Sequence, residues 1–203
     1  MNTKRLLMSL TTAAAFSAAA AQTAADGFKY TDEQFADIQM LRYRVEGFEK
    51  LTLKEKTFIY YLQEAALQGR DILFDQNGRY NLRIRRMLEK VYTDYKGDRA
   101  SADWHGFVTY LKRFWFSSGP HHHYGCEKFE PGFSEQWLRN ALVDINYEEA
   151  TCVPRTACGK SWEELLPVIF DPAVMPMRVN QKDGDDLVLT SAAHYYAPGI
   201  TPA

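Results

Sequence analysis

The fold of this chain is decided in residues 81–95, which read NLRIRRMLEKVYTDY. Apolar side chains recur there at intervals of three or four residues, and they are Ile84, Leu88, Val91, Tyr92 and Tyr95. This interval places them on one side of an α-helix. Gly97 follows the last of them, and glycine commonly ends helices. The stretch therefore predicts an amphipathic helix with one apolar side.

The preceding segment predicts another helix, with clear signals at both ends. Thr52 and Glu55 match a capping box, in which each side chain binds the other residue's backbone N–H. Gly69 supplies the stop. The apolar side chains that share one face of this helix are Phe58, Ile59, Leu62 and Ala66.

Two helices are predicted after residue 95. The first begins at Ser101 and ends at residues 117–119, and its apolar side chains are Trp104, Phe107, Val108, Leu111 and Trp115. A polar loop covers residues 119–133. Ser134 then caps the second helix, whose apolar side chains are Trp137, Leu138, Ala141, Leu142 and Ile145.

A further helix is predicted closer to the N-terminus, between Thr31 and Gly47. Thr31 and Gln34 match a capping box, and Gly47 provides an end. The apolar residues at helical spacing between them are Phe35, Ile38 and Leu41.

The last third of the chain has shorter patterns. Ser161 and Glu164 open a short helix that Pro167 and Pro172 limit. Residues 186–196 fit either a strand or a buried helix, because the apolar run that begins at Leu187 is short. We therefore expect a mainly α fold, with one strand near Leu187 as the open alternative.

The N-terminus predicts an exported protein. Residues 1–21 have the pattern of a signal peptide, in which Lys4 and Arg5 precede an apolar run and Ala19 and Ala21 provide the small-residue cleavage site. We expect cleavage after Ala21 and a periplasmic or secreted location. The alternative is a membrane anchor, but the strongly apolar part is too short to span a bilayer.

Charge and cysteine content narrow the function classes. The 203-residue chain has 24 basic and 26 acidic residues, and loss of Lys4 and Arg5 leaves 22 against 26, a net charge of −4. An exported acidic protein has no electrostatic basis for binding nucleic acid. Cys126, Cys152 and Cys158 are too few for a disulfide framework, although Cys152 and Cys158 could close a small loop.

The polar loop contains the most conspicuous candidate site. His121, His122, His123 and Tyr124 form a run that is followed two residues later by Cys126. Imidazole and thiolate are preferred zinc ligands, so His121, His123 and Cys126 could bind a metal ion. The alternative is a loop that lines a groove or serves the structure. Structural zinc needs four regularly spaced ligands, which favours the second interpretation.

Two polar segments at the start of the 81–95 helix have simpler interpretations. Residues 75–78, Asp-Gln-Asn-Gly, resemble a calcium loop but lack its first and last carboxylates, so we expect a turn between two helices. The arginines that follow are Arg79, Arg83, Arg85 and Arg86. We expect a salt-bridged helix face, with a cleft for peptide carboxylates as the alternative.

Several long segments resemble the N-terminal region of the bacterial dipeptidyl-peptidase III family. They are residues 34–37, 69–85, 121–129, 167–172, 179–182 and 187–192. The resemblance covers most of the chain from Gln34 to Tyr196. Residues 147–160, with Cys152 and Cys158, match no family pattern and are interpreted as a variable loop.

The resemblance implies a two-lobed α+β zinc peptidase that releases dipeptides from the N-termini of oligopeptides. In that family, zinc is bound by a His-Glu-x-x-Gly-His helix and a later glutamate. This chain has neither, so residues 22–203 would form the multi-helix part of the lobe opposite the zinc, truncated at the C-terminus. No residue of this chain matches a catalytic or metal-binding position of the family. Only His121, His122, His123 and Tyr124 are candidates for facing the substrate cleft.

Three functions therefore remain as hypotheses. The chain is part of a zinc dipeptidyl peptidase, inactive without a zinc-binding lobe or a companion chain that carries one, and we expect no zinc on this chain itself. Alternatively, it is a helical interaction module that exposes the face meant for that lobe. The third possibility is a small metal-binding protein that uses His121, His123 and Cys126.

Overall fold

The computed structural model describes residues 27–147 and 162–195. The predicted signal peptide with its cleavage site at Ala21, and the segment with Cys152 and Cys158, lie outside these residues. The chain forms two compact units. In the described part, the first comprises residues 27–34 and 38–45, and the second comprises residues 35–37 and all that follows residue 45.

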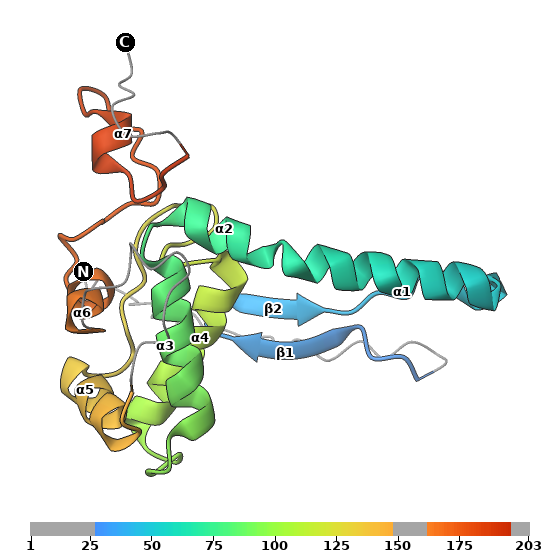
Figure 1. Cartoon of the computed structure of the whole chain (residues 1–203), viewed down its shortest axis with the longest axis horizontal. Coiled ribbons are helices and arrows are strands. Elements are labelled where there is room, and N and C mark those ends of the chain that lie inside the picture. The colour runs from blue at the N-terminus through green and yellow to red at the C-terminus, as the bar shows by residue number, and fades with distance from the viewer. Residues whose placement is uncertain (1–26, 148–161, 196–203) are drawn as a thin grey trace, which may run out of the picture. The chain divides into compact units, whose positions relative to one another are not determined.

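Over the described residues the chain is mainly helical, with one small two-stranded sheet (Figure 1). The elements in chain order are β1 (Thr31–Phe35), β2 (Ile38–Leu41), the 3-10 helix η1 (Phe48–Lys50), α1 (Leu53–Gln68), α2 (Arg70–Asn77), α3 (Asn81–Asp94), α4 (Ala102–Ser117), α5 (Glu135–Asp144), the 3-10 helix η3 (Trp162–Leu165), α6 (Leu166–Phe170) and α7 (Leu187–Thr190). The expectation of a mainly α fold is confirmed.

The prediction of a helix that begins at Thr31 is wrong, because this segment forms the hairpin of β1 and β2. Ala36 adopts a positive φ of 48° and helps to reverse the chain between the strands. The backbone N–H of Arg42 donates to the carbonyl oxygen of Tyr30 at 2.7 Å, across the ladder. Three apolar residues at helical spacing are too few to outweigh this pairing.

Helix α1 begins and ends as the sequence predicts. The Glu55 N–H donates to Thr52 Oγ1 at 3.3 Å, and the Thr52 N–H donates to Glu55 Oε2 at 2.7 Å, which completes the capping box. Gly69 ends α1 but adopts helical backbone angles, so α2 starts at the next residue. The sequence did not indicate α2 as a separate helix. A turn separates α2 from α3, as expected, but it lies at residues 78–80, because residues 75–77 belong to α2.

Helices α3 and α4 form the centre of the core and lie alongside each other in Figure 1. The side chains of Ile84, Leu88 and Val91 are fully buried, as the pattern in residues 81–95 predicts. The other core side chains from these two helices are Met87, Trp104, Phe107, Tyr110, Leu111 and Phe114. Both ends of the predicted helices are accurate to within a residue or two.

A glycine pair brings the loop before α5 against α4. A Cβ added at Gly106 would lie 1.8 Å from the carbonyl oxygen of Gly132, so only glycine permits this contact. Ser134 caps α5 by accepting the Trp137 N–H at 3.2 Å, as predicted. The Ser134 N–H also donates to Asp103 Oδ1 at 2.8 Å, which ties the start of α5 to α4.

The short helix predicted from Ser161 is η3 followed by α6, and both pack into the core through Leu165, Leu166 and Ile169. Pro167 does not limit it, because proline is tolerated in the first turn of a helix. The segment stops at Phe170, before Pro172.

Neither alternative for the segment near Leu187 is right in full. The segment forms α7, a single helical turn with no buried side chain. The predicted strand is therefore absent from this segment, and the helix that forms instead is not the buried one that was expected. Asp186 Oδ1 accepts the N–H groups of Val188 and Leu189 at 2.8 and 3.0 Å, and this cap favours a helical turn. Within the described residues, no helix has the length and apolar character needed to cross a membrane.

Candidate functional site

The histidine loop, residues 119–129, begins where α4 ends. Ser118 and Gly119 both adopt positive φ, and the Asn81 side-chain amide donates to the Ser118 carbonyl oxygen at 3.3 Å. The loop then folds back on itself, because the His122 N–H donates to the Glu127 carbonyl oxygen at 2.7 Å and the Phe129 N–H donates to that of Pro120 at 2.8 Å. The three histidines therefore project from a short, backbone-bonded turn.

His121 is directed into the protein. Its side chain is only 2% exposed, and its Nε2 donates to the Met175 carbonyl oxygen at 2.8 Å. Burial lowers the pKa of His121 to about 4, an effect that the bond to Met175 opposes and the charges of Lys128 and Arg178 reinforce. His121 is thus a neutral residue that fixes the segment after α6.

His122 and Tyr124 lie at the outer edge of the loop. His122 Nδ1 accepts the N–H groups of Tyr124 and Gly125 at 3.2 and 3.0 Å, so its proton is on Nε2. That Nε2 lies 3.6 Å from Oδ2 of Asp37, a residue of the same unit. The Tyr124 side chain is 85% exposed. Of the four candidate cleft residues, Tyr124 is the most accessible to a ligand.

His123 belongs to a small cluster with Arg178. Arg178 Nη2 donates to the His123 carbonyl oxygen at 2.9 Å and lies 3.5 Å from Cys126 Sγ. The His123 ring packs edge-on against Phe116. Partial desolvation lowers the pKa of His123, and the neighbouring His122 lowers it further. This cluster holds the turn of the loop in place.

The residues of the loop do not fit the metal ion that the pattern of His121, His123 and Cys126 allows as an alternative. A metal site needs at least three donors directed at one point. His121 Nε2 is already bound to Met175, and no group of three His, Cys, Asp or Glu side chains in the described ranges converges on a common centre. The sequence also has no two histidines one helical turn apart with a glutamate between them. We therefore derive no chemistry through a metal ion on this chain.

The arginines at the start of α3 are largely neutralised, as expected. Arg85 contacts Asp71 at 2.6 Å and Glu89 at 2.8 Å, and Arg83 pairs with Glu164. Arg79 differs. The described residues include no carboxylate partner for it, and its guanidinium lies 4.8 Å from the ring centroid of Tyr80.

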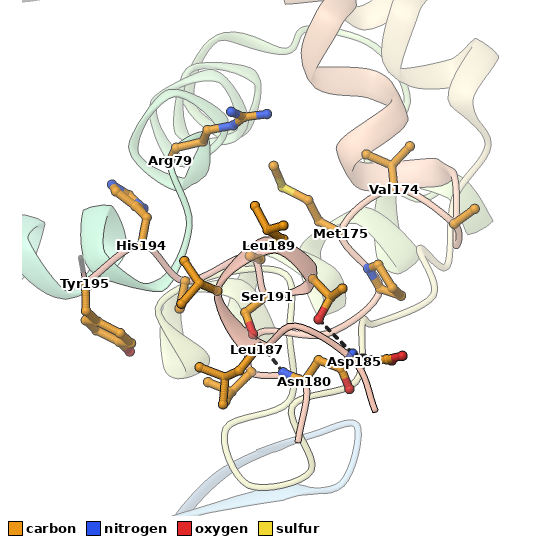
Figure 2. A pocket seen from close by; sticks show the side chains of 17 residues that line it. Arg79, Val174, Met175, Asn180, Asp185, Leu187, Leu189, Ser191, His194 and Tyr195 are labelled. Carbon is orange, nitrogen blue, oxygen red and sulfur yellow. Dashed lines mark hydrogen bonds between the residues drawn. The ribbon is translucent and has the colours of Figure 1, made fainter. Parts of the chain in front are cut away.

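A pocket of about 910 Å³ lies beside Arg79, in the part of the chain that follows α6 (Figure 2). Its walls are the segment 173–180, helix α7 and the residues after α7. Most of the lining is apolar, and the side chains that contribute are Val174, Met175, Val179, Leu187, Val188 and Leu189. This volume is within the range of about 300–1,000 Å³ that is typical of small-molecule sites.

Polar contacts hold the two walls of the pocket together. The Asn180 N–H donates to Ser191 Oγ, and its side-chain amide donates to Asp185 Oδ2 and Thr190 Oγ1, at distances of 2.8 to 2.9 Å. The far wall is attached to α2, because the His194 N–H donates to the Gln76 carbonyl oxygen at 3.1 Å. Sequence reasoning missed this pocket, since no single segment of the chain signals it.

The third notable feature is the surface of α1. None of its sixteen residues is buried by the described part of the chain. The large apolar side chains that it exposes are Leu53, Phe58, Ile59, Tyr60, Tyr61, Leu62 and Leu67. Phe58 is 63% exposed and Leu62 is 53% exposed, although the sequence predicts that both lie on the packed side of the helix.

No protein-family model matches this chain, and no curated protein matches it.

Proposed function

We propose that this chain forms part of the non-zinc lobe of a dipeptidyl-peptidase III-type peptidase, and that the apolar face of α1 docks the zinc-binding lobe. The complete enzyme would release dipeptides from oligopeptides in the periplasm or outside the cell. The chain itself would support the fold of the enzyme and form one wall of the substrate cleft. It would not carry out the chemistry, because it has neither the zinc ligands nor the catalytic glutamate of the family.

The observation that carries this proposal is the open face of α1. Its apolar residues have the spacing of a buried helix face, yet no side chain along the sixteen-residue helix is buried by the described part of the chain. Burial of one Phe, Ile or Leu side chain contributes about 1.5–3 kcal/mol, so an uncovered face of this kind marks a surface meant for a partner. The sequence segments between residues 34 and 192 that resemble the peptidase family suggest which partner this is.

Within this proposal, His122 and Tyr124 are the loop residues best suited to contact a peptide. Tyr124 is exposed, and the His122 Nε2–H is held by only a 3.6 Å contact to Asp37. His121 is instead assigned a structural role, because it is buried and bound to Met175.

The same open face also supports the second hypothesis, a non-enzymatic helical interaction module. The two functions differ in what occupies the face. An interaction module that pairs with itself would form dimers whose population rises with concentration, whereas a lobe that awaits a different partner remains a monomer. Light scattering over a range of chain concentrations distinguishes them.

The proposal is tested by an activity assay with a dipeptidyl arylamide substrate. The purified chain with added zinc is expected to release arylamine at the background rate. When it is mixed with the separately expressed zinc-binding lobe of a dipeptidyl-peptidase III enzyme, turnover is expected to exceed that of the lobe alone. Turnover by the purified chain without that lobe would overturn the proposal.

A matched pair of variants tests the role of α1 in this assay. Phe58→Glu places a charge on the apolar face, while Tyr60→Glu places it on the far side of the same helix, about 200° away. Both positions are exposed, so neither change should unfold the chain. We expect Phe58→Glu to abolish the gain in turnover and Tyr60→Glu to retain it. Equal effects of the two changes would contradict docking through this face.

A further inference from the structure

The pocket beside α7 carries opposite charges on different sides of an apolar interior. Arg79, on the turn between α2 and α3, contributes a guanidinium at one edge. Asp185, in the loop before α7, contributes a carboxylate at another. In Figure 2 the two residues are separated by the width of the pocket, with Leu189 and Ser191 between them.

Neither charge has an ion-pair partner within the described residues. Arg79 contacts the ring of Tyr80, and Asp185 Oδ2 accepts a hydrogen bond from the neutral amide of Asn180 at 2.8 Å. By contrast, Arg83, Arg85 and Arg86 of the adjacent helix all face carboxylates. The pocket thus retains one available cation and one available anion.

The walls of the pocket are built well enough to hold a ligand. His121 fixes the Met175 backbone, and Lys128 Nζ donates to the Asp171 carbonyl oxygen at 2.8 Å and also to that of Val174. On the other wall, Tyr195 OH donates to Asn77 Oδ1 at 3.1 Å. Both walls are therefore anchored to the helical core rather than only to each other.

We propose that this pocket binds a short zwitterionic peptide with apolar side chains. Its carboxylate would pair with Arg79, its ammonium group with Asp185, and its side chains would contact Leu187, Leu189 and Val174. An arginine suits a carboxylate because its N–H groups can donate in parallel, and the volume of about 910 Å³ accommodates a short peptide. This site is separate from α1 and requires no zinc-binding lobe.

Calorimetric titration of the purified chain with the dipeptide Leu-Leu tests the proposal without any variant. Leu-Leu is expected to bind at millimolar concentration and low ionic strength. N-acetyl-Leu-Leu, which lacks the ammonium group, and Leu-Leu amide, which lacks the carboxylate, should each bind about five- to tenfold more weakly. Absence of Leu-Leu binding, or equal binding of all three peptides, would overturn the proposal.

Variants then assign each charge to its residue. Arg79→Gln should weaken Leu-Leu binding but leave Leu-Leu amide unaffected, and Asp185→Asn should weaken Leu-Leu but leave N-acetyl-Leu-Leu unaffected. The matched controls are Arg86→Gln and Asp183→Asn, neither of which lines the pocket, and they should bind all three peptides as the unmodified chain does. If the controls weaken binding as much as the pocket variants, the site is not this pocket. The outcome does not depend on whether the chain docks a zinc-binding lobe.

Discussion

Helices α1 and α3 have similar sequence patterns but different surroundings. Both have apolar residues at intervals of three or four, and both end near a glycine. The α3 residues Ile84, Leu88 and Val91 are fully buried, whereas no residue of α1 is buried by the described part of the chain. Periodicity therefore predicts that a helix has an apolar side, but not which molecule covers that side.

The difference has an energetic consequence. An isolated helix of about 12–15 residues is only marginally stable in water, and most helical stability in proteins comes from packing. Helix α3 gains that packing from α4 and η3, while α1 depends mainly on its capping box and its continuation into α2. We therefore expect α1 and α3 to respond differently to equivalent changes.

The largest expected effect comes from truncating matched leucines in the two helices. Leu88→Ala should lower the free energy of unfolding by about 3 kcal/mol, because it leaves a cavity in a fully packed core. Leu62→Ala should change it by less than about 0.5 kcal/mol, because that side chain is already more than half exposed to water and leaves no buried cavity. Urea denaturation of both variants measures these values. A large loss for Leu62→Ala would mean that α1 is packed within the chain.

The second effect concerns stability in acid, and it arises in the second unit, which contains the helical core. The pKa of His121 is about 4 in the folded chain and near 6.5 when unfolded, so the unfolded state binds a proton first as the pH falls. The free energy of unfolding should therefore decrease between about pH 6.5 and pH 4, by up to about 3 kcal/mol. The contribution of His121 should not change further below pH 4.

The variant His121→Gln provides the control for this prediction. Glutamine can still donate to the Met175 carbonyl oxygen but does not titrate in this range. Its unfolding free energy should therefore decrease less than that of the unmodified chain between pH 6.5 and pH 4, as measured by urea denaturation at each pH. Parallel curves for the two proteins would show that His121 is not buried as a neutral group.

A smaller effect is expected from removing equivalent N-caps. Ser101→Ala removes the acceptor for the Trp104 N–H at the start of α4 and should cost about 1 kcal/mol of global stability. Thr52→Ala removes the equivalent acceptor at the start of α1. It should reduce the helical circular dichroism signal while leaving the urea midpoint unchanged, because α1 contributes little to cooperative unfolding. A shifted midpoint for Thr52→Ala would contradict this difference.

The sequence predicted the helices whose ends carry local signals. Thr52, Ser101 and Ser134 each cap the helix that their patterns indicate, and the capping contacts involve residues only three positions apart. The segment at residues 31–41 was predicted wrongly because its pairing depends on a reversal at Ala36, a residue that rarely adopts positive φ. The segment near Leu187 could be predicted only as either a strand or a buried helix, because an apolar run of three residues does not distinguish a strand from a helical turn.

The candidate sites were predicted less well, since they depend on contacts between distant segments. The sequence grouped His121 with His122 and His123, but the structure separates His121 from them by burying it against Met175, 54 residues away. Likewise, Arg79 and Asp185 line one pocket although they are more than 100 positions apart. Such proximity arises from tertiary packing, which local patterns do not encode.

Hydrogen exchange of the backbone amides in α1 and α3 tests the central claim most directly. It should be measured on the purified chain at a concentration where light scattering gives a monomer. The amides of residues 84–91 should exchange at least about a thousandfold more slowly than those of residues 57–66, because α3 opens only with the core whereas α1 can unfold locally. Equal protection of the two helices would contradict the claim that α1 has an open face for a partner.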